Sequence, residues 1–490
     1  MPDVLYIHPA KHDVDSGFQD LGFYFFISVG VIGLVNLLRQ ERLEVKGINY
    51  PAELIRNRSF RLKPWLAAQQ GVKLIMVDLH WYMHSYRAIS MVRACKQVLP
   101  DAEIVLGGIT ASLFATEILR SFPEVDFVIR GDAEKPLLAL ARLLISDPFE
   151  SLSSIPNLTY RLDGEVVENE QNYTATADNL DRPNFVDLDF LEHSSWYGRL
   201  QFEPTAQTQT LQEPRGHWLC IGRGCRYDCS FCGGGYQSHK LFAKRSGFVL
   251  CSPEKVVADI QQLAEKGIDQ VSLNLDTAIL PLEYWRTLFA QMRNLGIRIG
   301  INNELFQFPS QEFVEDFCQT ADTSRSELAL SLLTGSEKVR RLNGKHYTNQ
   351  KLFEIIDVMK ENQVPLYIYF SFNLPGEDEK SFDETLSVAR RIRHSYPPHL
   401  LKMVNMAHTL DPCSPMSRKP QRYAINISLR SFKDYFNYCE QTLNIQAGEG
   451  PWKVRGYTSR KDQSLPKMAW QWNKFCANQP NSCFRIPESW

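Results

Sequence analysis

The stretch "GHWLCIGRGCRYDCSFCGGG" (residues 216–235) joins a short apolar run to three closely spaced cysteines. The apolar run predicts a strand, and Cys225, Cys229 and Cys232 follow it in one loop. Thiolates bind zinc or iron–sulfur clusters. Structural zinc takes four closed ligands, usually from two pairs that lie far apart in sequence. The sequence has no distant Cys-x-x-Cys pair, so zinc would need Cys220 of the apolar run as its fourth ligand.

A [4Fe–4S] cluster explains why three cysteines suffice. Three thiolates bind three of its irons and leave one iron open, and an open coordination position can hold a substrate or a cofactor. Phe231 can shield such a cluster from water, while Gly233 and Gly234 let the backbone approach a ligand closely. A redox Cys-x-x-Cys at 229 and 232 would leave Cys225 without a role.

The segment 211–410 around these cysteines alternates six apolar runs with helical patterns. Such alternation predicts parallel strands joined by helices. A full eight-unit barrel takes about 250 residues, so this segment predicts a partial (β/α)6 barrel. Functional groups on such folds gather at the carboxyl ends of the strands. The residues expected there, besides Cys225, are Asp276, Glu304, Ser331, Asn373 and His408.

Residues 1–145 show a second series of strand and helix patterns, which predicts a doubly wound, Rossmann-like parallel sheet. Ligands of such sheets lie beyond the carboxyl ends of the strands. Gly107 and Gly108 form a tight turn there or allow close approach to a ligand. Arg130 and Gly131 contact a phosphate or amide, or Arg130 bridges to Asp132 or Glu134. The other residues expected at this edge are His8, Asp78 and His80.

Two further segments have other patterns. Residues 146–210 predict a linker that contains a hairpin with Asp163-Gly164 at its turn. Residues 411–490 predict a small cap, helical at 428–442 and otherwise irregular. Its tryptophans form either a core or a lid over a substrate cavity; they are Trp452, Trp470, Trp472 and Trp490.

Composition limits the class of protein. A chain of 490 residues with 44% apolar and 22% charged residues is typical of a multidomain globular protein. A net charge of −2 offers no global attraction for nucleic acid or anionic membranes, so we expect a small-molecule substrate. The 11 scattered cysteines and the absence of a signal peptide indicate a reducing cytoplasm rather than a disulfide framework.

One segment, "GFYFFISVGVIGLVNLL" (22–38), resembles a membrane span in composition. It is about 17 residues long, at the lower limit for crossing a bilayer. It also lies between two predicted strands. We therefore expect a buried core helix there and no transmembrane segment.

The pattern Cys-x3-Cys-x-aromatic-Cys, after a strand and Arg223-Gly224, resembles the radical SAM superfamily. The three cysteines match the family's three cluster ligands one for one. The resemblance implies that the open iron binds the amino and carboxylate groups of S-adenosylmethionine. One electron then cleaves this cofactor to methionine and a 5′-deoxyadenosyl radical, which takes hydrogen from an unactivated carbon. It also implies oxygen sensitivity and an electron donor of the flavodoxin or ferredoxin type.

The resemblance covers nearly the whole chain. "GGIT" (107–110) and "RGDAE" (130–134) are similar to the cobalamin-binding domain that is fused to many radical SAM enzymes. "SLLTGSEKVRRLNGKHYT" (331–348) resembles the fourth-strand segment of that group. "FNLPGED" (372–378) and "LDPCSPM" (410–416) resemble its fifth-strand signature and the segment after the sixth strand. Cobalamin is therefore the third cofactor implied.

The histidine that commonly ligates cobalt is absent. Many cobalamin proteins carry Asp-x-His-x-x-Gly after the first strand. Here "DLH" (78–80) follows the third strand, and Met83 stands at the glycine position. His80 or Trp81 faces the cobalt, or His80 is a hydrogen-bonded loop residue.

The resemblance also suggests contacts to S-adenosylmethionine. Asp276, Glu304 and Ser331 end their strands and could hold its amino or ribose groups. The family's usual Gly-Gly-Glu after the second strand is replaced by "LNLDTA". Glu337 and Arg341, or the adjacent Arg340, reach the carboxylate or ribose; alternatively, the segment is a solvated helix start capped by Ser336.

The resemblance implies a cobalamin-dependent radical SAM methyltransferase that acts on a small metabolite or natural-product intermediate. Two alternatives stay open. The same fold could support a non-methylating cyclisation, rearrangement or sulfur insertion. The chain could also be a sensor that binds the cluster and cobalamin without turnover.

Overall fold

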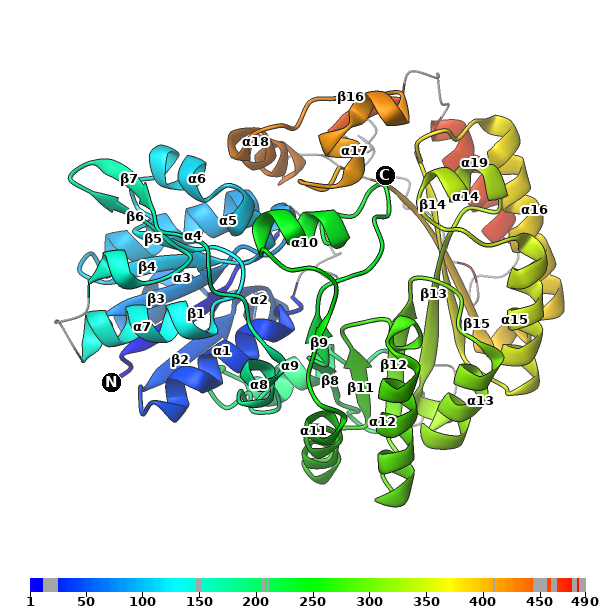
Figure 1. The fold of residues 1–490 in the computed structure, drawn as a ribbon, viewed down its shortest axis with the longest axis horizontal. Helices are drawn as coiled ribbons and strands as arrows, with labels where there is room; N and C mark the ends of the chain where they lie inside the picture. The colour runs from blue at the N-terminus through cyan, green and yellow to red at the C-terminus, as the bar shows by residue number, and fades with distance from the viewer. Residues whose placement is uncertain are drawn as a thin grey trace.

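A computed structural model describes residues 1–11, 25–146, 151–204, 208, 211–408, 410–443, 456–459, 465–477 and 483. Trp452 and Trp490 lie outside these residues. Figure 1 shows an amino-terminal α/β unit beside a second, larger α/β unit.

The amino-terminal unit is built on a seven-stranded sheet of order β2-β1-β3-β4-β5-β6-β7. The first five strands pair in parallel, and β6 and β7 are antiparallel. The strands are β1 (Val4–His8), β2 (Val45–Asn49), β3 (Leu74–Asp78), β4 (Glu103–Gly107), β5 (Phe127–Ile129), β6 (Leu158–Leu162) and β7 (Glu165–Glu168).

Helices cover both faces of this sheet, as the doubly wound pattern predicts. Along β1, Val4 and Tyr6 pack toward one layer, and Leu5 and Ile7 pack toward the other. This alternation follows from the two-residue period of a strand. The first layer holds α1 (Val29–Gln40) and α7 (Glu134–Ile145). The second holds α3 (Leu62–Ala67), α4 (Ser85–Val98) and α6 (Ala115–Ser121); α2 (Tyr50–Arg56) and α5 (Ile109–Leu113) complete the unit.

The predicted hairpin turn at Asp163-Gly164 is confirmed, and both residues have positive φ. The hairpin is not part of a surface linker, however. Its first strand pairs antiparallel with β5 and buries Leu158 and Tyr160, so the hairpin extends the amino-terminal sheet. The helices α8 (Ala177–Asp181) and α9 (Ser194–Leu200) follow it.

The apolar segment 22–38 contributes a buried helix, as predicted. Residues 22–24 lie outside the described part, and α1 begins at Val29. Ile32, Val35 and Leu38 pack against the sheet. Among the described helices, none combines the length and the apolar character that a bilayer crossing requires.

The second unit is the predicted partial barrel. Its six parallel strands have the order β15-β14-β13-β12-β11-β8. They are β8 (Gly216–Leu219), β11 (Gln270–Leu273), β12 (Gly300–Leu305), β13 (Glu327–Leu333), β14 (Leu366–Phe372) and β15 (Leu401–Ala407). Helices α11 (Pro253–Glu265), α12 (Leu282–Asn294), α13 (Gln311–Thr320), α14 (Glu337–Leu342), α15 (Asn349–Glu361) and α16 (Glu379–Ser395) connect them.

The carboxyl-terminal segment divides between the two units. Helix α18 (Phe432–Leu443) packs on α4, with ring centroids of Tyr86 and Phe436 5.1 Å apart. Helix α19 (Leu465–Cys476) packs on the barrel instead, where Trp472 meets Phe370. The remaining elements here are α17 (Pro415–Arg418), β16 (Ile425–Ile427) and β17 (Tyr457–Ser459).

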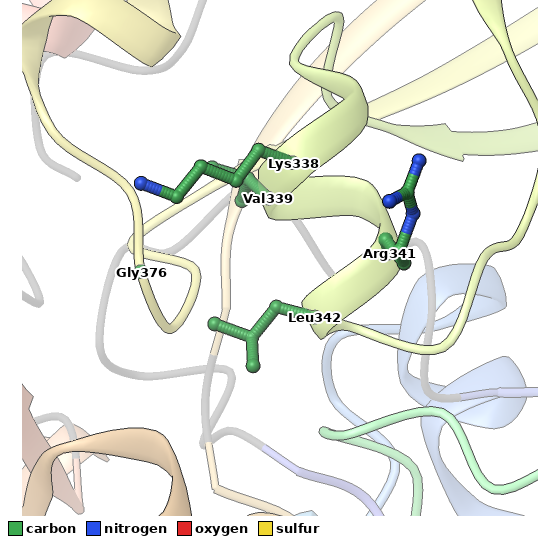
Figure 2. A pocket seen from close by; sticks show the side chains of 5 residues that line it. All are labelled: Lys338, Val339, Arg341, Leu342 and Gly376. Carbon is green, nitrogen blue, oxygen red and sulfur yellow. The ribbon is translucent and has the colours of Figure 1, made fainter.

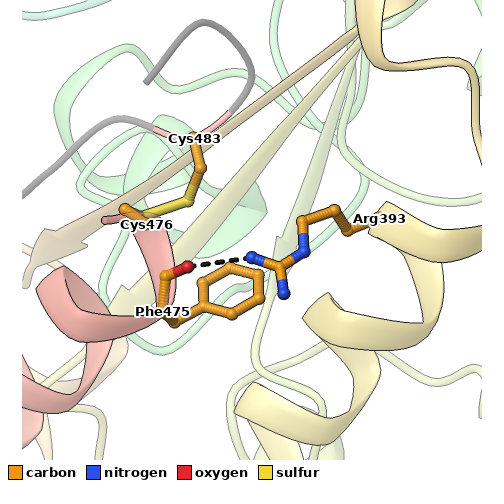
Figure 3. Close-up of a disulfide and its surroundings, with 4 residues drawn as sticks. All are labelled: Arg393, Phe475, Cys476 and Cys483. Carbon is orange, nitrogen blue, oxygen red and sulfur yellow. Dashed lines mark hydrogen bonds between the residues drawn. A yellow bond between two sulfur atoms is a disulfide. The ribbon is translucent and has the colours of Figure 1, made fainter. Parts of the chain in front are cut away.

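A disulfide joins Cys476 at the end of α19 to Cys483, although the cysteine pattern predicts none (Figure 3). Cys483 forms a parallel bridge with Met403 of β15, which brings its Cα to 5.2 Å from that of Cys476. The nearby Arg393 donates a hydrogen bond to the carbonyl oxygen of Phe475 at 2.8 Å. Sequence spacing alone gives no sign of this packing.

Helix α19 provides a test of its role in the barrel core. Trp472 is fully buried, whereas Trp470 on the same helix is 61% exposed. We expect Trp472→Ala to lower the free energy of unfolding by about 3–5 kcal/mol because it empties a core site, and Trp470→Ala to have little effect. Thermal unfolding of both variants measures this. Equal thermal midpoints would contradict the assignment of Trp472 to the core.

Candidate functional site

The three cysteines lie in the loop between β9 (Gly222–Arg223) and α10 (Tyr236–Phe242), beyond the carboxyl end of β8. We call residues 225–235 the cluster loop. Ser230 donates to the side chain of Asn343, and its backbone N–H donates to the Asn343 carbonyl at 3.3 Å. Gly344 packs directly against the backbone of Cys229. The loop is therefore fixed by the segment that follows α14.

The glycines after the cysteines serve different contacts. A Cβ on Gly233 would lie 2.6 Å from the carbonyl oxygen of Pro412, and the Gly233 N–H donates to Asp411 at 3.1 Å. Tight packing thus requires glycine at 233. Gly234 lies beside Cys232, because a Cβ on Gly234 would be 3.8 Å from the Cys232 sulfur. Gly234 is therefore next to this sulfur, as close approach to a cofactor would require.

The sulfur atoms sit in a partly dehydrated environment. Burial raises the pKa of the Cys225 and Cys232 thiols. Backbone N–H groups of Tyr227 and Gly234 donate to these two sulfurs at 3.4 and 3.3 Å and favour the thiolates. Iron would displace the thiol protons on binding.

No three His, Cys, Asp or Glu side chains in the described part of the chain converge on one point that could hold a single metal ion. A cluster has no such requirement, because each thiolate binds a different iron. The three cysteines of one loop therefore fit a [4Fe–4S] cluster.

A buried group of charges joins the cluster loop to the amino-terminal sheet. Arg223, two residues before Cys225, contacts Asp132 at 3.0 Å and Glu134 at 2.5 Å. Arg245 forms a second ion pair with Asp132. Burial opposes the charge on Arg223, but Glu134 and Asp132 outweigh it and raise the pKa of the guanidinium. Arg223 therefore stays charged and links the carboxyl ends of the two sheets.

Arg130 and Gly131 have contacts within the chain that the sequence does not indicate. Arg130 donates to the carbonyl of Asn169 and lies 3.9 Å from Glu168, so it does not bridge to Asp132 or Glu134. Its partners belong to the end of the hairpin, which the sequence does not place beside it. Gly131 has φ +72°, and a Cβ there would meet Ala243 at 3.0 Å. This glycine allows the chain after α10 to approach the amino-terminal unit.

The edge of the amino-terminal sheet faces α10 (Figure 1). Gly108 has φ +106°, and a Cβ there would lie 2.6 Å from the His80 Cα, so the turn at this position requires glycine. A Cβ on Gly107 would meet open space. Trp81 is 38% exposed and contacts His80 edge-on at 4.9 Å. Gly107, His80 and Trp81 thus offer an accessible surface at the place where doubly wound sheets bind ligands.

Burial lowers the pKa of His80 to about 4, so its imidazole is neutral at neutral pH. A neutral imidazole can bind a metal ion or accept a hydrogen bond through its unprotonated nitrogen. Beneath it, Asp78 accepts hydrogen bonds from Tyr6 at 3.0 Å and His8 at 3.0 Å. The sequence places His8 and Asp78 at this edge but does not show that they pair.

Two of the residues predicted to contact S-adenosylmethionine bind each other, and the described part of the chain gives neither side chain a backbone partner. Glu304 is exposed and accepts a hydrogen bond from Ser331 at 2.5 Å. Partial desolvation raises the pKa of Glu304, and the Ser331 hydroxyl lowers it again. This pair can accept and donate hydrogen bonds to a ligand.

The other three have structural partners or face outward. Asp276 is buried and accepts hydrogen bonds from the N–H groups of Ala278, Phe306 and Gln307. Glu337 accepts from the N–H of Asn349 at 2.7 Å. Arg341 lies on the exposed face of α14 and lines a surface pocket (Figure 2). Arg340 is buried and binds carbonyl groups of its own loop.

Two residues near the cluster loop extend the site. Lys345, which the sequence does not single out, is buried and donates a hydrogen bond to the Phe306 carbonyl. Its positive charge lowers the pKa of Cys225 and of Asp276, against the larger effect of burial. His408 was expected at a strand end, and its ring lies 4.1 Å from that of Phe231. Burial lowers the pKa of His408 to about 3, so the ring is neutral. Phe231 and His408 therefore form a largely uncharged wall beside Cys232.

Comparison with known proteins agrees with this geometry. Residues 219–389 match the Radical SAM superfamily. The anaerobic magnesium-protoporphyrin IX monomethyl ester cyclase of Cereibacter sphaeroides is 24% identical over 320 residues, which cover 62% of this chain and 47% of the cyclase. A tRNA-2-methylthio-N(6)-dimethylallyladenosine synthase of Mycobacteroides abscessus is 24% identical over 243 residues, or 46% and 44% of the two chains. The chain thus spans about half the length of these relatives.

Two solved structures share the fold. The radical S-adenosylmethionine methyltransferase TsrM from Kitasatospora setae, solved with cobalamin and a [4Fe-4S] cluster, has a TM-score of 0.64 and 14% identity. The superposition covers 98% of this chain and 88% of TsrM. The cobalamin-dependent radical enzyme OxsB has a TM-score of 0.60 and 14% identity, with coverage of 90% and 66%.

The protein therefore carries a radical SAM domain, with the [4Fe–4S] cluster and S-adenosylmethionine that define this superfamily. Over nearly its full length, its fold is that of the cobalamin-dependent radical SAM enzymes.

The charge group at Arg223 can be tested directly. Arg223→Ala leaves Glu134 buried without its cation, and we expect a loss of about 3–5 kcal/mol in the free energy of unfolding. Arg226→Ala is the matched control, because Arg226 is exposed, donates to the Ile279 carbonyl at 3.3 Å and forms no ion pair with a described residue. Thermal unfolding and limited proteolysis between the two units measure the effect. Similar behaviour of both variants would show that Arg223 does not hold the units together.

Proposed function

We propose that this protein is a cobalamin-dependent radical SAM methyltransferase that acts on an unactivated carbon of a small metabolite or natural-product intermediate. One observation carries the proposal: Arg223 joins the cluster loop to Asp132 and Glu134 at the carboxyl edge of the amino-terminal sheet. A cofactor on that edge would face the cluster. TsrM, which shares the fold, was solved with cobalamin and a [4Fe-4S] cluster bound.

The residues of this chain have separable tasks. Cys225, Cys229 and Cys232 would hold the cluster, and Phe231 with His408 excludes water beside it. Gly107, His80 and Trp81 would bind the corrinoid. Glu304 and Ser331 would bind polar groups of S-adenosylmethionine or of the substrate inside the barrel. When bound, the cofactors supply the radical and the methyl group, while the protein supplies position and shielding.

A second candidate is a radical reaction on the same fold without methyl transfer. The relative from Cereibacter sphaeroides is named as a cyclase, and the relatives from Mycobacteroides and Corynebacterium as tRNA-2-methylthio-N(6)-dimethylallyladenosine synthases. These names favour cyclisation or sulfur insertion as the alternatives. The two candidates share the cluster and differ in the product.

The test is anaerobic reconstitution with iron, sulfide and hydroxocobalamin, followed by incubation with S-adenosylmethionine and a small-molecule extract. We expect a cluster absorption near about 400 nm, bound corrinoid, and a product heavier by about 14 Da, the mass of one added methylene. A product without that gain would favour the second candidate. Absence of both the cluster band and bound corrinoid would contradict both candidates.

Cysteine variants assign the cluster ligands. Cys225→Ala, Cys229→Ala and Cys232→Ala should each lose most of the bound iron and the cluster absorption. Cys220→Ala is the matched control, because this buried thiol contacts the Gly222 carbonyl and lies beside Cys251. If Cys220→Ala lost as much iron as the others, a four-cysteine site would replace the cluster with an open iron.

Substitutions at two adjacent glycines test whether the corrinoid binds at Gly107. Gly107→Ala adds a methyl group into open space, so we expect weaker retention of hydroxocobalamin with an unchanged thermal midpoint. Gly108→Ala introduces a clash with His80 and strains a residue at φ +106°, which should cost about 1–3 kcal/mol of stability. The ratio of bound corrinoid to protein, measured by absorbance, shows whether each variant retains hydroxocobalamin. Normal corrinoid binding by Gly107→Ala would remove Gly107 from the proposed site.

A further inference from the structure

Helix α14 has one face toward the cluster loop and one toward solvent. On the inner face, Val339 is 1% exposed and packs with Leu333 and Leu374. Phe231 of the cluster loop packs against this same group. Phe231 is the residue before the ligand Cys232. Packed apolar side chains therefore connect α14 to Phe231, next to the proposed site of the cluster.

Hydrogen bonds fix this arrangement. Asn343, directly after α14, is fully buried and binds Ser230, which lies between Cys229 and Cys232. Its side-chain amide also donates to the carbonyls of Val339 and Pro375 at 2.8 and 3.0 Å. The cluster loop, α14 and the loop around Gly376 thus form one connected body.

The outer face of this body carries a pocket of ≈ 450 Å³ (Figure 2). Lys338, Arg341 and Leu342 are exposed there, and Leu342 packs on Gly376. The pocket residues, which we call the α14 surface, are Lys338, Val339, Arg341, Leu342 and Gly376.

The α14 surface is positively charged. Neither Lys338 nor Arg341 forms an ion pair with any residue that the structure describes. The neighbouring acids are already engaged: Glu337 accepts from the Asn349 N–H, Asp378 caps α16, and Glu379 pairs with Lys467 at 2.7 Å. Within the part of the chain that the structure describes, the surface therefore presents two cations outside any ion pair, beside the exposed Leu342.

We propose that the α14 surface docks an acidic electron-transfer protein of the flavodoxin type, which reduces the cluster. This inference rests on the cluster of the proposed function. In the step, an anionic flavin hydroquinone gives one electron to the oxidised cluster and becomes a neutral semiquinone. No bond forms or breaks, and no proton moves.

Three physical features favour this partner. Opposite charges steer association and raise the rate of encounter. Transient redox complexes use small interfaces of less than about 1,200 Å², which a pocket with one exposed leucine and two cations can nucleate. The packed chain from Val339 through Phe231 gives the electron a route through dense protein. Two cations on a chain of net charge −2 are too few for a nucleic-acid track.

The experiment measures cluster reduction by stopped-flow absorbance in the reconstituted full-length protein. The reductant is either a purified flavodoxin, kept reduced by its NADPH-dependent reductase, or dithionite. The test variant is Lys338→Glu/Leu342→Glu. The matched control is Arg298→Glu, which reverses an exposed charge at the amino end of β12, the opposite end of the barrel.

We expect the double variant to slow reduction by flavodoxin at least tenfold at low ionic strength and to change reduction by dithionite less than twofold. Added salt should remove most of the difference, because surface charge is screened. Arg298→Glu should match the wild type with both reductants. Equal flavodoxin rates in all three proteins, or equal losses with both reductants, would overturn the proposed docking site.

A second measurement separates this inference from the proposed function. Fluorescence titration of the cluster-free protein with flavodoxin reports docking without any chemistry. Weaker, salt-dependent binding by the double variant supports the α14 surface even if no methylated product forms. Unchanged binding contradicts it even if the enzyme proves to be a methyltransferase.

Discussion

The buried ion-pair group of Arg223, Asp132, Glu134 and Arg245 is the interaction on which the arrangement of this protein depends. Charges of this kind are costly to remove from water, and each needs its partner in place. Asp132 is shared between two arginines, and Glu134 begins α7 of the amino-terminal unit. Because Arg223 directly precedes the cluster loop, the pairing aligns the two sheets at the ends where each would bind its cofactor. A different relative orientation of the units would leave several charges buried without partners.

The cluster loop is likewise held in place by contacts with specific residues of other segments. Asn343 binds Ser230, Gly344 contacts Cys229, and Gly233 donates to Asp411. These contacts come from two segments, one that follows β13 and α14 and one that follows β15. A loop of three cysteines and several glycines has little intrinsic order, so its shape is imposed by these segments. The barrel thereby holds this glycine-rich loop in place where the chemistry of the proposed reaction needs a rigid one.

The sequence predicts much of this molecule because its strongest signals are local. Strand and helix patterns, the Asp163-Gly164 turn and the spacing of the cysteines depend on neighbouring residues, and the structure contains the predicted elements. Contacts between distant segments could not be predicted. Arg130 binds the end of a hairpin, Asp276 holds the loop after β12, and Cys483 meets Cys476 only because the tail returns to β15. The sequence around these residues does not indicate which residues they contact. The division of the carboxyl-terminal segment between the two units is unpredicted for the same reason.

The bridge between Met403 and Cys483 has a consequence for the open barrel. A barrel of six strands keeps two free edges, and a free edge is a template for pairing with other chains. At β15, Cys483 occupies one position of that edge through its bridge to Met403, and the disulfide ties Cys483 to α19, which packs against the barrel. The six-stranded barrel can therefore stay open and still resist edge-to-edge association at β15.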